Sequence, residues 1–238
     1  MDKINPIIIG DVEKFSIVDF PNKIAAVVFM QGCPWRCPFC YNLSLQKIGA
    51  TPESEWTFES FKCFLQRRKN VLDAVVFSGG EPLVQNGLEQ AIDEVKNLGY
   101  EIGLHTGGFR PDLLKRIVDK LDWVGFDIKA PLIAEKYKIA TSCFDKVESV
   151  IDSLKILIDS GINFECRTTC DPRILSVDDI YEIANTLKNF GVKEYYLQKY
   201  RPVESDNITT EYMCESIISD EKLIDFLKNS FEIFDVRK

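Results

Sequence analysis

The sequence predicts an α/β fold, a partial (β/α)6 barrel in which one open parallel sheet is covered by helices. Short, nearly continuous apolar runs alternate with longer amphipathic runs, as expected for parallel strands that are buried on both faces and joined by helices. Six such strand–helix units follow one another, and right-handed crossovers would place their strands in a single sheet. Six units are too few to close a barrel of eight strands.

The elements can be placed in order along the chain. The predicted strands span residues 25–30, 73–78, 100–105, 122–128, 162–169 and 194–199. The predicted helices span residues 57–69, 86–98, 111–120, 145–160 and 176–190. Thr57 and Ser176 stand where helix-capping residues are expected. Gly161 and Gly191 follow helices and precede strands, as helix-ending glycines do.

The whole chain is expected to form one domain, residues 1–238. Within it we expect an N-terminal hairpin (1–24, with its turn at 19–22), the partial barrel (25–200) and a C-terminal closing segment (201–238). The closing segment is expected to contain a helix and a strand within 219–236.

Composition limits the classes of protein that the chain can belong to. Lys and Arg number 29 and Asp and Glu 37, so the net charge is −8, and no basic block is present. Such a chain is a poor general nucleic-acid binder. No run approaches the roughly 20 apolar residues that a membrane helix needs. The first residues lack the apolar core of a signal peptide. We therefore expect a cytoplasmic protein with neither a nucleic-acid nor a membrane partner.

Polar or metal-binding residues follow every predicted strand, and in (β/α) folds chemistry collects at these strand ends. The six strands in order are followed or ended by Cys33, Glu81, His105, Asp127, Arg167 and Gln198. This is more than loop composition requires, so we predict an active site at this end of the barrel.

Three of the eight cysteines are crowded into one loop, Cys33, Cys37 and Cys40, with the spacing C-x3-C-x2-C. In a reducing compartment clustered cysteines usually indicate metal or redox chemistry. Three thiolates on one loop can bind three irons of a 4Fe–4S cluster and leave the fourth iron without a protein ligand. A zinc or redox loop is the alternative, although no second cysteine pair lies at zinc-ribbon spacing and the chain has one His.

The triad with an aromatic residue, Phe39, before its third cysteine resembles the signature of the radical S-adenosylmethionine (SAM) superfamily. The resemblance runs along the whole chain and implies the radical SAM fold, one 4Fe–4S cluster and SAM. In that family the open iron takes the amino and carboxylate groups of SAM. The reduced cluster then cleaves SAM to methionine and a 5′-deoxyadenosyl radical.

Gly79, Gly80 and Glu81 resemble the GGE motif with which that family binds the SAM amino group. Paired glycines at a strand end allow a close approach of the backbone to a ligand, and Glu81 could accept a hydrogen bond from an ammonium. A turn with a solvated Glu is the alternative explanation for the same residues.

Asp127 and Lys129 lie two apart on a strand and therefore point the same way. They resemble the D-x-K stretch of glycyl-radical-enzyme activases, in which the Lys contacts the SAM carboxylate. Arg167 resembles the activase Arg that also binds this carboxylate. A surface ion pair is the alternative for Asp127 and Lys129.

His105 and Thr106 align with an Asp-Thr pair that helps to bind a monovalent cation in the pyruvate formate-lyase activase type. Thr106 is assigned to the SAM site, but His in place of Asp puts the cation in question, and a hydrogen-bonded pocket histidine is the alternative. Segments 10–21 and 196–202, the latter with Gln198, resemble activating proteins of anaerobic ribonucleotide reductase. No role is assigned to Gln198.

Cys166 and Cys170 could suggest a second cluster, but activases with extra clusters carry a Cys-rich insert after the triad. Residues 41–72 contain one cysteine, Cys63. Buried cysteines are more often structural than metal ligands. We therefore expect a single cluster and core positions for Cys166 and Cys170.

Three functions are compatible with these residues. The first is an activase that forms a glycyl radical on a partner enzyme, an anaerobic ribonucleoside-triphosphate reductase or a pyruvate formate-lyase-like enzyme, with flavodoxin or ferredoxin as electron donor. The second is a radical SAM enzyme that acts on a small molecule, such as a 7-carboxy-7-deazaguanine synthase type, or on a peptide. The third is a zinc-binding interaction module without catalysis.

Overall fold

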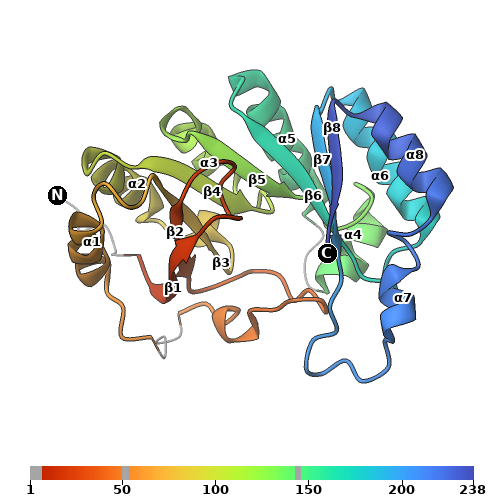
Figure 1. Cartoon of the computed structure of the whole chain (residues 1–238), viewed down its shortest axis with the longest axis horizontal. Coiled ribbons are helices and arrows are strands. Elements are labelled where there is room, and N and C mark those ends of the chain that lie inside the picture. The colour runs from red at the N-terminus through yellow and green to blue at the C-terminus, as the bar shows by residue number, and fades with distance from the viewer. Residues whose placement is uncertain (1–6, 50–53, 143–145) are drawn as a thin grey trace.

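The computed structural model describes residues 7–49, 54–142 and 146–238 (Figure 1). Its centre is one sheet of eight strands that lie side by side in chain order, from β1 to β8. Strand β1 is antiparallel to β2, and every later pair of neighbours is parallel. The predicted open parallel sheet is confirmed, because β1 and β8 are the two edges and do not pair with each other.

The six predicted strands are all present, with ends within two residues of the predicted ones. They are β2 (Ala25–Met30), β3 (Ala74–Gly79), β4 (Glu101–Thr106), β5 (Trp123–Asp127), β6 (Phe164–Cys170) and β7 (Glu194–Lys199). Two edge strands, β1 (Ile9–Ser16) and β8 (Ile233–Arg237), extend the sheet beyond the six predicted units.

The predicted helices are also present. They are α1 (Phe58–Arg67), α2 (Leu88–Asn97), α3 (Pro111–Ile117), α5 (Val147–Ser160) and α6 (Val177–Asn189). Thr57 and Ser176 each form a capping box with the residue three positions later. Residues 118–120 continue α3 as a 3₁₀ turn, η3 (Val118–Lys120).

Sequence patterns did not indicate every helix. Helix α4 (Ala134–Thr141) begins without a side-chain cap and buries only Tyr137, Ala140 and Thr141, so it lacks the long apolar stripe that identifies a helix. Helix α7 (Glu211–Glu215) is only five residues long. Within the predicted closing segment, helix α8 (Glu221–Ser230) and strand β8 confirm the expected helix and strand.

The N-terminal hairpin lies differently from the prediction. Its turn falls at 19–22 as expected, where Lys23 N–H donates to the Phe20 carbonyl at 3.3 Å and Asn22 has φ +60°. Its second strand, however, is β2 itself and not a segment before residue 25. The first barrel strand therefore has a partner on both sides, which satisfies the hydrogen-bonding groups along both of its edges.

The helices cover the outer face of the sheet (Figure 1) and form the main apolar core with it. Side chains alternate across each strand. On β6, Cys166 and Cys170 belong to this core, whereas Glu165, Arg167 and Thr169 point to the other, inner face. That inner face carries the polar residues of the site. No helix in the described parts of the chain is long and apolar enough to cross a membrane.

Candidate active site

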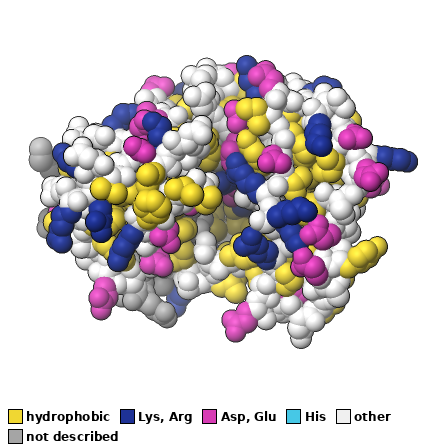
Figure 2. All heavy atoms as spheres, in the orientation of Figure 1, with side chains coloured by type: hydrophobic (Ala, Val, Ile, Leu, Met, Phe, Trp, Pro, Cys, Tyr) yellow, Lys and Arg dark blue, Asp and Glu magenta, His cyan; other side chains and the backbone are white. Residues whose placement is uncertain are grey.

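A cavity of about 470 Å³ lies at the carboxyl ends of the strands, and the surface is hollowed between the two halves of the molecule (Figure 2). The structure brings all thirteen predicted site residues to its wall. They are Cys33, Cys37, Phe39, Cys40, Gly79, Gly80, Glu81, His105, Thr106, Asp127, Lys129, Arg167 and Gln198. Because these residues come from six strand ends, the sheet topology alone explains why they meet.

The loop that carries the triad is held mainly through its backbone. Before the triad, Gly32 N–H donates to the Leu45 carbonyl at 2.7 Å. Arg36 closes the loop on itself, because its guanidinium donates to the Cys33 carbonyl at 2.7 Å, while its own N–H donates to the Thr141 carbonyl at 2.7 Å. Arg173 donates to the Pro38 carbonyl at 3.3 Å. These bonds leave the cysteine side chains available for a ligand.

Cys33, Cys37 and Cys40 are free thiols. Burial raises the pKa of Cys33 to about 12 and that of Cys37 to about 11, so a positively charged metal centre would be needed to keep them as thiolates. Among the described residues, no three His, Cys, Asp or Glu side chains converge as around one metal ion. A four-iron cluster needs no such convergence, since each thiolate binds a different iron. Three unpaired thiols on one cavity loop therefore fit such a cluster.

The two glycines of the GGE turn have a packing reason that the sequence did not reveal. A Cβ on Gly79 would lie 2.2 Å from the Met30 nitrogen, and one on Gly80 would lie 2.2 Å from the Gly32 carbonyl oxygen. Gly79 also has φ +113°, which disfavours any other residue. The pair lets the end of β3 lie against the backbone that leads into the triad.

Glu81 is buried, so the alternative of a solvated Glu is wrong. Its carboxylate accepts hydrogen bonds from the Thr106 hydroxyl at 2.5 Å, from Gly107 N–H at 2.9 Å and from Leu83 N–H at 3.1 Å. Burial raises its pKa, and these hydrogen bonds act in the opposite direction. The carboxylate is thus held rigidly at the cavity wall, where it could accept from an ammonium.

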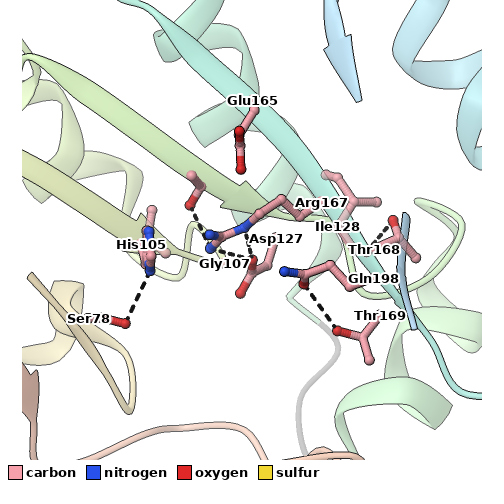
Figure 3. Close-up of polar contacts among 12 residues, drawn as sticks. Ser78, His105, Gly107, Asp127, Ile128, Glu165, Arg167, Thr168, Thr169 and Gln198 are labelled. Carbon is pink, nitrogen blue, oxygen red and sulfur yellow. Dashed lines mark hydrogen bonds and ion pairs between the residues drawn. The ribbon is translucent and has the colours of Figure 1, made fainter. Parts of the chain in front are cut away.

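Asp127 binds the two predicted cations of the site, and Figure 3 shows its contact with Arg167. Arg167 donates to its Oδ1 from Nε at 3.0 Å and from Nη2 at 2.8 Å, and Lys129 Nζ lies 3.4 Å from its Oδ2. Burial would raise the pKa of Asp127, but Arg167 and Lys129 outweigh burial and lower it. Burial would lower the pKa of Lys129, but Asp127 and the nearby thiols raise it. Lys129 therefore stays charged at the cavity wall.

His105 is hydrogen-bonded on both ring nitrogens. Its Nε2 lies 3.0 Å from the Asp19 carbonyl, which can only accept, so Nε2 carries the proton. In the neutral ring Nδ1 then accepts from the Ser78 hydroxyl at 3.4 Å (Figure 3). Burial and the charge of Arg167 lower its pKa to about 3. The structure therefore shows a neutral, hydrogen-bonded pocket histidine.

A second ion pair in the cavity region was not predicted from the sequence. Arg237, on the last strand, donates through both terminal nitrogens to the buried Glu165, at 2.7 Å for Nη2 to Oε2. Its guanidinium stacks on the Tyr196 ring, 3.9 Å from the centroid. The spacing of Glu165 and Arg167 on β6 puts both on the inner face, but nothing in the sequence pairs Glu165 with a residue 72 positions away. Gln198 accepts from the Thr169 hydroxyl at 3.4 Å.

Among the described residues, none of the other cysteines lines the cavity. Cys166, Cys170 and Cys214 are buried and Cys63 is exposed. Burial raises the pKa of Cys166 and of Cys170, so both are protonated core side chains. Cys143 lies outside the described residues.

With this geometry established, comparison with known proteins defines the class. The model of the Radical SAM superfamily matches residues 27–170, which is more than half of the chain, and the chain belongs to that superfamily. It is 30% identical over 224 residues to the pyruvate formate-lyase-activating enzyme of Clostridium pasteurianum, across 90% of this chain and 92% of that protein.

A second relative, from Methanocaldococcus jannaschii, is named as a glycyl-radical enzyme activating enzyme and is 29% identical over 211 residues, across 83% of this chain and 82% of the relative. A solved radical SAM methyltransferase from Sphaerobacter thermophilus shares the fold, with a TM-score of 0.68 at 14% identity over 92% of this chain and 67% of that chain.

Proposed function

We propose that this protein is a radical SAM activase that generates a glycyl radical on a partner enzyme. The partner would be an anaerobic ribonucleoside-triphosphate reductase, because segments 10–21 and 196–202 resemble the activating proteins of that enzyme. Flavodoxin or ferredoxin would supply the electron. The relatives named for glycyl-radical activation support the activase class.

The cavity residues would bind the cluster and SAM in the following way. Cys33, Cys37 and Cys40 would hold one 4Fe–4S cluster, which when reduced supplies the electron that cleaves SAM to methionine and a 5′-deoxyadenosyl radical. Lys129 and Arg167 would meet the SAM carboxylate, and Glu81 would accept from the SAM ammonium. Charge-assisted contacts of this kind contribute about 1.5–3 kcal/mol each.

The rest of the predicted SAM site would shape the pocket. Phe39 lies beside the third cysteine and lines the cavity. Gly79 and Gly80 allow the turn to lie close to the neighbouring backbone, and Thr106 fixes the position of Glu81 by its hydrogen bond. No acid–base residue is needed for abstraction of a hydrogen atom, so the task of the chain is to orient the reactants and exclude water.

The observation that carries the choice of a protein substrate is the open, partly apolar mouth of the cavity. The loop after β1 contributes Asp19 to the cavity wall. Phe15 near the end of β1, and Ile17 and Val18 in that loop, are 55%, 68% and 80% exposed. After the triad, Tyr41 lines the cavity and is 56% exposed. Exposed apolar groups beside a cavity are typical of protein-binding surfaces. An extended loop with a Gly could enter here and place its Cα within about 3–4 Å of the radical carbon.

The test is anaerobic reconstitution with SAM, dithionite and either anaerobic ribonucleoside-triphosphate reductase or pyruvate formate-lyase. Electron paramagnetic resonance should show the doublet of a glycyl radical on one partner, and oxygen should then cleave that partner at the Gly. SAM cleavage that is fully coupled to a purified nucleobase or another metabolite, without a protein radical, would replace the activase by the small-molecule alternative. Bound zinc without iron would favour the interaction module.

A further inference from the structure

The monovalent cation that the activase resemblance implies does not fit the residues of this cavity. Positions 105 and 106 correspond to the pair that would help to hold it, and Asp127 is the neighbouring carboxylate on the next strand, since Thr106 pairs with Phe126 in the sheet. Alkali and alkaline-earth cations are bound by oxygen ligands with free lone pairs. Each of these three side chains is already engaged by groups of the protein itself.

Position 105 carries an imidazole and not a carboxylate. Its Nε2–H donates to Asp19 and its Nδ1 accepts from Ser78, so neither nitrogen is left for a cation. The Thr106 hydroxyl donates to Glu81 and its oxygen accepts from Gly108 N–H at 3.0 Å. Position 105 therefore offers a cation neither a negative charge nor an oxygen, and the uncharged Thr106 oxygen, which already accepts one hydrogen bond, has at most one lone pair left for it.

Asp127 holds a cation that belongs to the chain. Its Oδ1 accepts two hydrogen bonds from Arg167, which is its partner across β5 and β6. The guanidinium bends along the sheet toward Gly125, the residue that pairs with His105 across β4 and β5. A Cβ on Gly125 would lie 2.7 Å from both Cζ and Nη1 of Arg167. The glycine therefore leaves the space in which the guanidinium lies, between His105 and Asp127.

A neutral residue at 105 is consistent with this placement. The fixed positive charge of Arg167 disfavours a second positive charge beside it, whether that charge is a protonated imidazole or a bound metal ion. The chain thus has a permanent cation that cannot dissociate, and Asp127 balances it.

We propose that the Arg167 guanidinium takes the place of the monovalent cation, so that SAM binding by this protein does not depend on Na⁺ or K⁺. The inference concerns the SAM site alone and needs no partner enzyme. It can therefore fail while the activase function stands, and it can hold if the substrate is a metabolite.

The test measures SAM binding by isothermal titration calorimetry to the anaerobically reconstituted protein, in choline, sodium or potassium chloride at one ionic strength. We expect dissociation constants that agree within about twofold. A tenfold or greater tightening by Na⁺ or K⁺ would overturn the proposal.

A second measurement removes the internal cation. Arg167→Gln should weaken SAM binding in choline chloride, and K⁺ or Na⁺ should restore part of the loss because Asp127 is then without its arginine. Arg116→Gln, which removes an exposed arginine on α3 that pairs with Glu89, should behave like the wild type in every salt. Equal weakening of Arg167→Gln in all three salts would show that Arg167 does not act in place of a cation. Iron content and circular dichroism check that the variants are folded.

Discussion

The triad loop and the charged residues of β5 and β6 lie at the same cavity, but they are prepared for ligands in opposite ways. In the triad loop the backbone is fixed by hydrogen bonds, whereas the thiols of Cys33, Cys37 and Cys40 are free. On β5 and β6 the side chains of Asp127 and Arg167 are fixed by each other. The first region therefore offers free thiols to the proposed metal centre, whereas Asp127 and Arg167 already balance each other's charge.

This difference predicts how strongly each region responds to substitution. Removing a thiol of the triad would remove a proposed cluster ligand, and no other described cysteine lines the cavity to replace it. Removing one member of the charged group leaves other charges that compensate in part, as expected for a coupled network. Effects should therefore decrease from the triad, through the cations and the buried ion pair, to the neutral histidine.

The largest effect is expected for Cys37→Ala. The reconstituted wild type should contain about four irons per chain, and the variant should lose the cluster and all SAM cleavage. Cys166→Ala is the matched control, because Cys166 is a buried core thiol that does not line the cavity. It should keep its irons. Iron analysis and the yield of 5′-deoxyadenosine check both variants.

Two results would break the single-cluster interpretation. One is an iron content near eight per chain in the wild type, which corresponds to two such clusters. The other is loss of the cluster in Cys166→Ala although that variant is folded.

A smaller but clear effect is expected for Lys129→Ala. Lys129 has a longer contact with Asp127, 3.4 Å, than Arg167 has. Of the two cations, it therefore gives up the weaker contact when it turns to a ligand carboxylate. SAM binding should weaken on the order of tenfold or more, the equivalent of about 1.4 kcal/mol or more.

Lys199→Ala is the control for this measurement. Lys199 also lines the cavity, but it is paired with Glu211 and Glu215, and its loss should leave SAM affinity near that of the wild type. Calorimetry measures the SAM affinity of both variants. Wild-type SAM affinity in Lys129→Ala would mean that the SAM carboxylate does not bind at Lys129.

The same contrast explains what the sequence could predict. The triad and the GGE turn are local patterns, and their residues meet because neighbouring strand ends meet, so the sequence sufficed to place them. The partners of a charged side chain depend on distant residues. Arg237 on β8 and Glu165 on β6 come together only through the addition of an edge strand, and no spacing in the sequence encodes that contact.

The same distinction between local and distant information applies to the helices. Helices α1 and α6 carry both a capping box and an apolar stripe, and both signals are local. Helix α4 has neither, and it is held by packing of Tyr137, whose ring contacts Trp35 of the triad loop at 6.4 Å between centroids. A helix of that kind is specified by the tertiary structure and not by its own periodicity.

The buried pair of Glu165 and Arg237 should affect stability more than catalysis. Glu165 is 1% exposed in its side chain and Arg237 35%. Glu165→Gln removes the charge and leaves the guanidinium without its carboxylate, so the free energy of unfolding should fall by about 1–3 kcal/mol. Urea unfolding of the cluster-free protein, followed by circular dichroism, measures this change.

The matched control is Glu232→Gln. Glu232 forms an exposed pair with Lys193, with side chains 68% and 71% exposed, and such pairs contribute about 0–1 kcal/mol. If both substitutions lower the free energy of unfolding by the same amount, the buried Glu165 pair does not stabilise the fold more than an exposed pair does.

The smallest effect concerns His105, the only histidine of the chain. Its pKa is lowered to about 3, against about 6.5 for an unfolded chain. Between these values the unfolded state binds more protons, so the histidine makes stability rise with pH over about pH 3–6.5 and adds no slope above it. Nitrogen-15 NMR of the cluster-free protein should show one neutral imidazole, protonated at Nε2, that does not titrate from pH 5 to 9. The urea-denatured chain serves as the control and should titrate near 6.5. A folded-state midpoint between pH 5.5 and 7 would mean that the ring is not buried beside Arg167 as the structure has it, and it would remove the electrostatic contrast between the two regions.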